Sequence, residues 1–178
     1  MSTDPTVAND LASVAVRSIE MMPAGDLAAF AEVVHPDGFT RERRAAPPWA
    51  RGTGPAAFHA LAEWLRAAID DLSYEIHHVV ADGDLVTVNS TMHGRHTATV
   101  VFWTEDAQVD QAFVPTGRRF AITQSHWFRM ADGKVLEHWA NRDDLGMARQ
   151  LGWVPPTPAY LVRCALAARK ARRAPRSA

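Results

Sequence analysis

The spacing of the apolar residues changes once along this chain, near Asp71. Before Asp71 the apolar side chains recur every three or four residues, which is typical of helices with one buried side. After Asp71 apolar and polar side chains alternate, which is typical of strands in a sheet with one buried face. Helices followed by a meander of strands predict an α+β fold, in which N-terminal helices pack on a curved antiparallel sheet.

The first part of the chain predicts three helices and no strand. The first helix covers about residues 7–22. Asp26 can cap the second helix, which ends before Pro36 because a residue that precedes proline avoids the helical conformation. The third helix covers about residues 56–69. The basic stretch 41–48 ends in prolines and is expected to be a loop.

The second part predicts strands joined by tight turns. The strands cover about residues 72–80, 85–97, 99–103, 120–130 and 134–141. Asp82-Gly83-Asp84 and Ala131-Asp132-Gly133 supply the turn residues of two hairpins. The acidic stretch 105–110 is expected to be a loop.

A basic helix is expected at the C-terminal end, over residues 159–173. Its arginines are expected to stay in water while its apolar residues pack on the rest of the molecule. The alternative is that the basic residues attract an anionic membrane or nucleic acid. These apolar residues are Leu161, Val162, Ala165 and Leu166. We therefore divide the chain into one domain, residues 1–152, and a C-terminal basic helix and tail, residues 153–178.

The hairpin around Gly133 decides which side chains share a face of the sheet. With Gly133 in the left-handed conformation of a three-residue loop, His126 lies opposite His138 and Phe128 opposite Leu136. A two-residue loop would place His126 opposite Trp139 and mix apolar with charged side chains on both faces. The first register is preferred because it gathers apolar side chains on one face. These are Phe120, Ile122, Phe128, Met130 and Leu136.

The apolar face carries three obvious polar side chains, Gln124, His126 and His138. A few polar groups on an apolar concave face are typical of a pocket for a small hydrophobic molecule. The pocket is expected to include Ile122, Gln124, His126, Phe128, Leu136 and His138. A buried histidine can equally be hydrogen-bonded to a neighbour without any function. Asp143 and Asp144 precede a short helical pattern, so they are expected to cap a helix rather than to catalyse.

Composition and missing motifs exclude several classes of protein. Nineteen lysines and arginines against twenty aspartates and glutamates leave a net charge of −1, which argues against a nucleic-acid partner. The single cysteine excludes a disulfide framework within the chain and a cysteine-rich zinc site. No metal is expected, because the eight histidines include no H-E-x-x-H motif. No apolar run is long enough to span a membrane, and the N-terminus lacks a secretory signal pattern, so a cytoplasmic protein is expected.

Several short motifs, taken in order, resemble those of the SnoaL-like polyketide cyclases. They are His35-Pro36-Asp37, Pro115-Thr116-Gly117-Arg118, Gln124-Ser125-His126-Trp127-Phe128-Arg129, Asp132-Gly133-Lys134, Glu137-His138-Trp139 and Gln150-Leu151-Gly152. The resemblance spans about residues 7–152. It implies the cone-shaped α+β barrel of the nuclear-transport-factor-two-like superfamily, built around an apolar cavity. It also implies ring closure of a polyketide by an intramolecular aldol step, with no metal or organic cofactor.

One position departs from the pattern of that family. The family's acid/base is an aspartate two residues after the histidine of the last strand, and this chain has Ala140 there. An alanine cannot move a proton, so the resemblance carries over the cavity but not the complete aldol mechanism. It also carries over Gln124, His126 and His138, while Ala140 is expected only to line the site. His126 or His138 could then remove a proton next to a carbonyl, and Gln124 could hydrogen-bond the enolate oxygen.

Three functions stay open from the sequence. The first is cofactor-free acid/base chemistry, a cyclisation or an isomerisation, on a polyketide or related small hydrophobic substrate. The second is hydroxylation, because the resembled family includes anthracycline hydroxylases on this fold. The third is a small-molecule carrier without catalysis.

A homodimer is expected as well. Trp127 and Trp139 fall on the face of the sheet that points away from the site, next to Arg129 and Glu137. Such an apolar patch usually marks a contact surface. The alternative is that residues 104–114 or the C-terminal helix cover these two rings within one chain.

Overall fold

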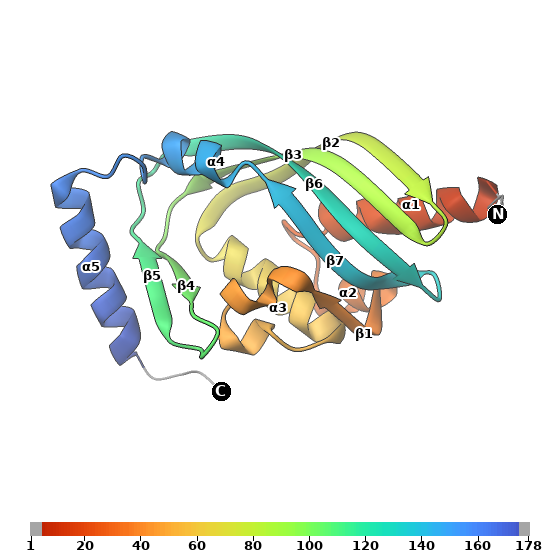
Figure 1. Ribbon diagram of the computed structural model, residues 1–178, viewed down its shortest axis with the longest axis horizontal. Helices are drawn as coiled ribbons and strands as arrows, with labels where there is room; N and C mark the ends of the chain where they lie inside the picture. Colours follow the sequence, from red (N-terminus) through yellow and green to blue (C-terminus); the bar gives the residue numbers. More distant parts are fainter. Residues whose placement is uncertain (1–4, 175–178) are drawn as a thin grey trace.

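The computed structural model describes residues 5–174 (Figure 1). The helices are α1 (Pro5–Glu20), α2 (Leu27–Val33), α3 (Gly54–Arg66), α4 (Asp144–Leu151) and α5 (Pro158–Arg173). Two short 3-10 helices are η1 (Arg41–Ala45) and η2 (Pro48–Ala50). The strands are β1 (Val34–Thr40), β2 (Ile69–Asp82), β3 (Leu85–His96), β4 (Val100–Trp103), β5 (Val109–Phe113), β6 (Arg119–Ala131) and β7 (Lys134–Arg142).

The main sheet has five strands in the order β1-β7-β6-β3-β2. It arches over helices α1, α2 and α3 (Figure 1), so the predicted α+β cone is confirmed. Strand β1 pairs parallel with β7, whereas the other neighbours pair antiparallel. The sheet is therefore mixed rather than purely antiparallel. Strands β4 and β5 form a separate two-stranded sheet, on which α5 packs.

Two strands were missed by the sequence analysis. The expectation that three helices precede any strand is wrong, because β1 follows α2 directly. The proline at position 36 ends the helix as expected, but an edge strand also tolerates proline, and β1 is the edge. Strand β5 begins at Val109, inside the stretch expected to be an acidic loop. Its residues Val109 and Ala112 are buried against α5, which a sequence pattern of five residues does not reveal.

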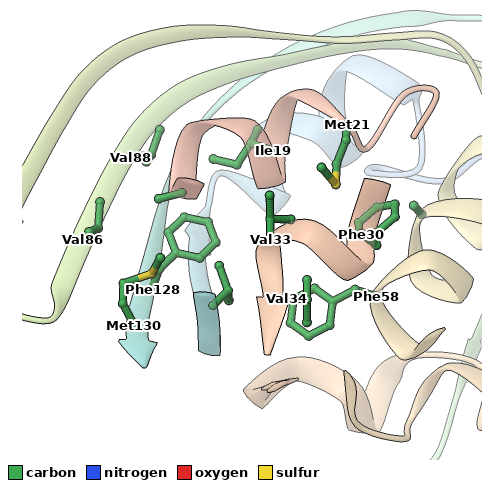
Figure 2. Packing of buried hydrophobic residues seen from close by; sticks show 13 residues of the cluster. Ile19, Met21, Phe30, Val33, Val34, Phe58, Val86, Val88, Phe128 and Met130 are labelled. Carbon is green, nitrogen blue, oxygen red and sulfur yellow. The ribbon is translucent and has the colours of Figure 1, made fainter. Parts of the chain in front are cut away.

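The core consists of two large apolar clusters beneath the main sheet. The first lies under the β6–β7 end and includes Phe30, Val33, Phe58, Val88 and Phe128 (Figure 2). The second includes Met92, Phe120, Ile122, Leu151 and Trp153. On β6 the inward-facing residues between these clusters are Gln124 and His126, since Ile122 belongs to one cluster and Phe128 to the other. The polar positions thus interrupt the core near its middle.

The β6–β7 hairpin does not have the predicted register. Asp132 and Gly133 form a two-residue turn with φ values of 50° and 73°, as in a type I′ turn. Met130 then pairs with Val135, and the register shifts before the next pair, leaving one extra residue, Leu136, on β7. This extra residue is a β-bulge.

The bulge changes the partners of the histidines but not the face on which they lie. His126 lies opposite Ala140 and Phe128 opposite His138, so the predicted pairs His126–His138 and Phe128–Leu136 are wrong. A two-residue turn followed by one bulged residue has the same effect on the later alternation as a three-residue loop. His126 and His138 therefore share the inward face, as predicted.

Helix α5 packs through small residues rather than through its large apolar ones. Leu161, Val162 and Leu166 are 53%, 61% and 61% exposed, so the predicted packing of these residues on the domain is wrong. Ala168 is buried instead, and the Arg172 guanidinium donates hydrogen bonds to backbone carbonyls of β5. Alanines allow the helix to approach the strand closely, which large side chains would prevent. Among residues 5–174, no helix is both long and apolar enough to cross a membrane.

The two tryptophans of the β6–β7 hairpin lie on the outer face of the sheet. Trp127 pairs with Trp139, and their rings stack at 6.1 Å with an angle of 5° between the planes. The Arg41 guanidinium lies 3.8 Å from the centre of the Trp139 ring and forms an ion pair with Glu137. Arg41 therefore covers part of this surface within one chain, a contact the sequence analysis did not anticipate.

The bulge predicts unequal effects of two neighbouring substitutions. Val135 is completely buried in the first core cluster, whereas Leu136 is only partly buried. Val135→Ala should lower the free energy of unfolding by about 2 kcal/mol, because it leaves a cavity in the core. Leu136→Ala should lower it by less than about 1 kcal/mol, although it removes the larger side chain. Denaturant unfolding of both variants measures the difference, and a larger loss for Leu136→Ala would contradict the bulge.

A homodimer through the outer face of β6 and β7 stays a prediction. Trp139→Glu would place a charge in the centre of that contact and should convert the protein to monomers in sedimentation equilibrium. Val80→Glu, which alters an exposed residue on the opposite edge strand β2, should leave the mass unchanged. An unaltered protein that sediments as a monomer would rule the dimer out.

Candidate active site

The two histidines on the inward face contact each other directly. His126 Nδ1 and His138 Nε2 are 2.9 Å apart and share a hydrogen bond. The contact is diagonal across the hairpin, since His138 lies opposite Phe128 and His126 opposite Ala140. The sequence analysis brought these two side chains together, and the structure places them in contact.

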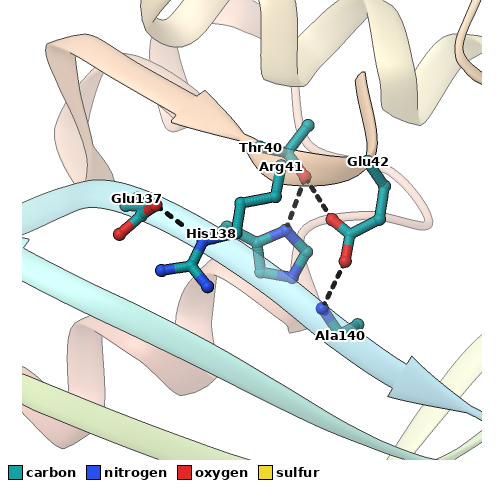
Figure 3. Close-up of polar contacts among 6 residues, drawn as sticks. All are labelled: Thr40, Arg41, Glu42, Glu137, His138 and Ala140. Carbon is teal, nitrogen blue, oxygen red and sulfur yellow. Dashed lines mark hydrogen bonds and ion pairs between the residues drawn. The ribbon is translucent and has the colours of Figure 1, made fainter. Parts of the chain in front are cut away.

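A chain of hydrogen bonds continues from His138 to a carboxylate (Figure 3). His138 Nδ1 lies 3.2 Å from the Thr40 hydroxyl, which donates a 2.8 Å hydrogen bond to Glu42 Oε2. The backbone N–H of Ala140 donates a 2.8 Å hydrogen bond to the other carboxylate oxygen, Glu42 Oε1. Both oxygens of Glu42 therefore accept hydrogen bonds at the wall of the site.

Local structure accounts for the position of these two residues. Thr40 is the last residue of β1 and pairs with His138 of β7. The 3-10 helix η1 begins at Arg41 and turns the chain back over β7, which places Glu42 above Ala140. Thr40 and Glu42 were not expected at the site, because no strand was predicted between the second helix and the loop 41–48. Only the prediction of a strand at 34–40, paired with the last strand, would have placed these two residues near His138.

Burial keeps both imidazoles neutral. Loss of contact with water, with a smaller contribution from Arg142, lowers the pKa of His138 to about 3. Burial also lowers the pKa of His126 well below its ordinary value, with smaller contributions from His138 and Arg142, while Glu42 acts in the opposite direction. Phe58 and Phe128 lie against His138, with ring centres 6.4 Å and 5.1 Å away. The pair therefore occupies an apolar environment.

Three of the buried polar atoms that have no hydrogen-bond partner among residues 5–174 lie close to the histidine pair. They are Ser90 Oγ, Gln124 Nε2 and His126 Nε2. Ser90 lies opposite Gln124 on the neighbouring strand, and His126 follows two residues later on the same face as Gln124. A buried polar atom without a partner costs about 1–3 kcal/mol and calls for an explanation. Polar groups of a ligand would supply the missing partners.

The other residues predicted for the site flank the three buried polar atoms on β6 or lie on β7. Ile122 and Phe128 are buried in the two core clusters on either side. Ala140 contributes its backbone N–H to Glu42, and Leu136 is the bulged residue of β7. Asp143 caps α4 by accepting a hydrogen bond from the backbone N–H of Gly146, as expected.

Two hollows of the surface lie away from the histidine pair. One hollow runs along α5, past Leu166 and Arg173, and another lies on the outer face of the sheet, past Glu75 and His93. Neither hollow borders the histidine pair. In the part of the chain that the structure describes, no group of three or more histidine, cysteine or acidic side chains could hold a metal.

Burial of His138 makes stability depend on pH. The folded state keeps this ring neutral down to about pH 3, whereas the unfolded state protonates it near its ordinary pKa of 6.5. The folded state therefore binds fewer protons in this range, and the free energy of unfolding falls as the pH falls. His138→Gln should make that fall less steep, by up to about 1.4 kcal/mol per pH unit between roughly pH 6 and pH 4. Urea unfolding measures the slopes.

The matched control is His78→Gln, which alters an exposed histidine on β2 and should leave the slope unchanged. Equal slopes for the unaltered protein and His138→Gln would show that His138 is not held neutral by the fold.

Comparison with known proteins identifies a family. A model of the SnoaL-like polyketide cyclase family matches residues 12–151. The aklanonic acid methyl ester cyclase DnrD of Streptomyces peucetius is 34% identical over 111 residues. The matched part is 59% of this chain and 66% of DnrD, slightly less than two thirds of that relative's length.

Solved structures show the same fold at lower identity. TsrD from Streptomyces laurentii superposes with a TM-score of 0.65 at 22% identity, over 85% of this chain and 98% of TsrD. AclR from Streptomyces galilaeus, described as a candidate hydroxylase, superposes with a TM-score of 0.60 at 21% identity, over 92% of this chain and 94% of AclR. The family match covers most of the sequence and includes both histidines. This chain belongs to the SnoaL-like polyketide cyclase family.

Proposed function

We propose that this protein closes a ring in a polyketide by acid/base chemistry, without a cofactor, and that His126 is the base. The observation that carries the proposal is the buried, partnerless Nε2 atom of His126, beside the partnerless Gln124 Nε2 and Ser90 Oγ. A base and two groups able to donate hydrogen bonds on one apolar face are what enolate chemistry needs. Family membership and the 34% identity to a polyketide cyclase support the same chemistry.

The proposed reaction is an intramolecular aldol step. His126 Nε2 removes a proton from a carbon next to a carbonyl, and the C–H electron pair forms an enolate. The enolate oxygen accepts hydrogen bonds from the Gln124 amide and the Ser90 hydroxyl. The enolate carbon then attacks a second carbonyl carbon of the same molecule, and the resulting alkoxide takes the proton back from His126. One carbon–carbon bond forms, and the product is an isomer of the substrate.

Burial lowers the pKa of His126, yet it is compatible with this role. The lowered pKa expresses the cost of placing an isolated positive charge among apolar side chains. In the proposed step the imidazolium forms together with a negative enolate next to it. Opposite charges in a poorly solvated site attract each other strongly, which offsets that cost. The same surroundings exclude water that would otherwise protonate the enolate.

The substrate class proposed is the methyl ester of a polycyclic polyketide acid. DnrD, which shares 34% identity over the matched region, acts on aklanonic acid methyl ester according to its name. The residues that flank the polar atoms on β6, Ile122 and Phe128, are apolar, as contact with fused rings requires. Hydroxylation of such a compound and its binding without conversion are the alternatives that an assay must separate.

The test is incubation of the purified protein with aklanonic acid methyl ester, followed by chromatography and mass measurement. Ring closure gives a product of unchanged mass. His126→Ala should lower turnover by roughly 10²-fold or more, because it removes the base. His78→Ala, a substitution at an exposed position on β2, should leave turnover unchanged. A product heavier by one oxygen atom, or binding without any product, would contradict the proposal.

A further inference from the structure

A carboxylate lies at the position where this chain departs from its family, but it comes from another part of the sequence. Glu42 belongs to η1, about a hundred residues before β7, and accepts a hydrogen bond from the backbone of Ala140. The sequence motifs give it no role. We propose that Glu42, acting through Thr40 and His138, is a positioning residue that keeps His126 Nε2 unprotonated and available as a base. The contribution of Glu42 to catalysis rests on the proposed function.

The positions of the protons follow from the groups in the chain. A carboxylate only accepts hydrogen bonds, so the single proton of the Thr40 hydroxyl points to Glu42. The Thr40 oxygen must then accept from His138, which places a proton on His138 Nδ1. A neutral imidazole carries one proton, so His138 Nε2 is an acceptor.

The position of the proton on His126 follows from that on His138. His138 Nε2 accepts from His126 Nδ1, which places the one proton of neutral His126 on Nδ1. His126 Nε2 is then left with a lone pair, and this is the buried atom without a partner. Four groups in sequence thus determine which nitrogen of His126 is the base.

Glu42 also stabilises His126 when that ring takes up a proton. Every bond of the chain then points from the positive ring toward the negative carboxylate, so the hydrogen bonds strengthen together. The charge of Glu42 favours the protonated form of His126, which agrees with its opposing effect on the pKa of that ring. Arg142 acts against it. Glu42 is in this way a distant counter-charge that does not contact the substrate.

Substitution of Glu42 by Gln should reverse the direction of each hydrogen bond between residue 42 and His126. The Gln oxygen has to face the backbone N–H of Ala140, since that donor is fixed. The Gln amide nitrogen then faces Thr40, whose hydroxyl can rotate to accept from it. The Thr40 proton would point to His138 Nδ1, and the proton of each ring would move from Nδ1 to Nε2. His126 would have no free lone pair toward the site.

The experiment is nitrogen-15 NMR of the histidine rings in the whole protein without substrate, combined with turnover. In the unaltered protein both rings should carry the proton on Nδ1, with assignments from the His126→Gln and His138→Gln spectra. In Glu42→Gln both protons should move to Nε2, and turnover should fall by roughly 10²-fold. Thr40→Ser keeps the hydroxyl and should keep both proton positions. Glu137→Gln, a substitution at the neighbouring carboxylate of the outer face, should change neither ring.

The spectra separate this inference from the proposed function. Protons on Nδ1 that move in Glu42→Gln, in a protein that does not convert any polyketide, would uphold the hydrogen-bonded chain and contradict the proposed reaction. A proton on His126 Nε2 in the unaltered protein would overturn the inference, and that spectrum needs no variant to fold. Unchanged proton positions in Glu42→Gln would overturn it as well.

Discussion

The parallel pairing of β1 with β7 is the contact on which the site depends. It places Thr40 beside His138, and through η1 it brings Glu42 to the backbone of Ala140. It also covers the outer edge of β7, which would otherwise expose unpaired backbone groups. A strand that directly continues α2 thereby connects the N-terminal helices to the candidate site. Loss of this pairing would leave the histidine pair without its carboxylate.

The site combines unpaired polar atoms with a well-packed core. Ser90 and Gln124 are almost completely buried, yet one polar atom of each has no partner in the described residues. Apolar residues at these positions would make the fold more stable, because no hydrogen-bonding capacity would be wasted. The two flanking clusters provide the stability that compensates for these atoms. In the proposed function these atoms are in place for a polar ligand before it binds.

Much of the fold and part of the site could be predicted from sequence because they depend on local periodicity. The alternation along β6 and β7 placed Gln124, His126 and His138 on one face, although the loop length and the partners were wrong. Thr40 and Glu42 could not be found in this way, because their role depends on pairing between strands that are far apart in the sequence. The predicted contacts of α5 were wrong for a related reason. Apolar spacing indicates which residues can be buried, but only the partner strand selects small residues over large ones.

The bulge at Leu136 affects how relatives of different length should be compared. Val135 and His138 both face inward although they are three positions apart, whereas inward residues of a regular strand are separated by an even number. A relative lacking the residue equivalent to Leu136 would regain regular alternation and keep both side chains inward. Loss of the residue equivalent to Glu137 has the same effect, because Val135 and His138 are then two positions apart. Alignments of this hairpin should therefore place a single-residue gap between Val135 and His138, because a gap elsewhere in β7 would misalign the histidine of a relative that has one.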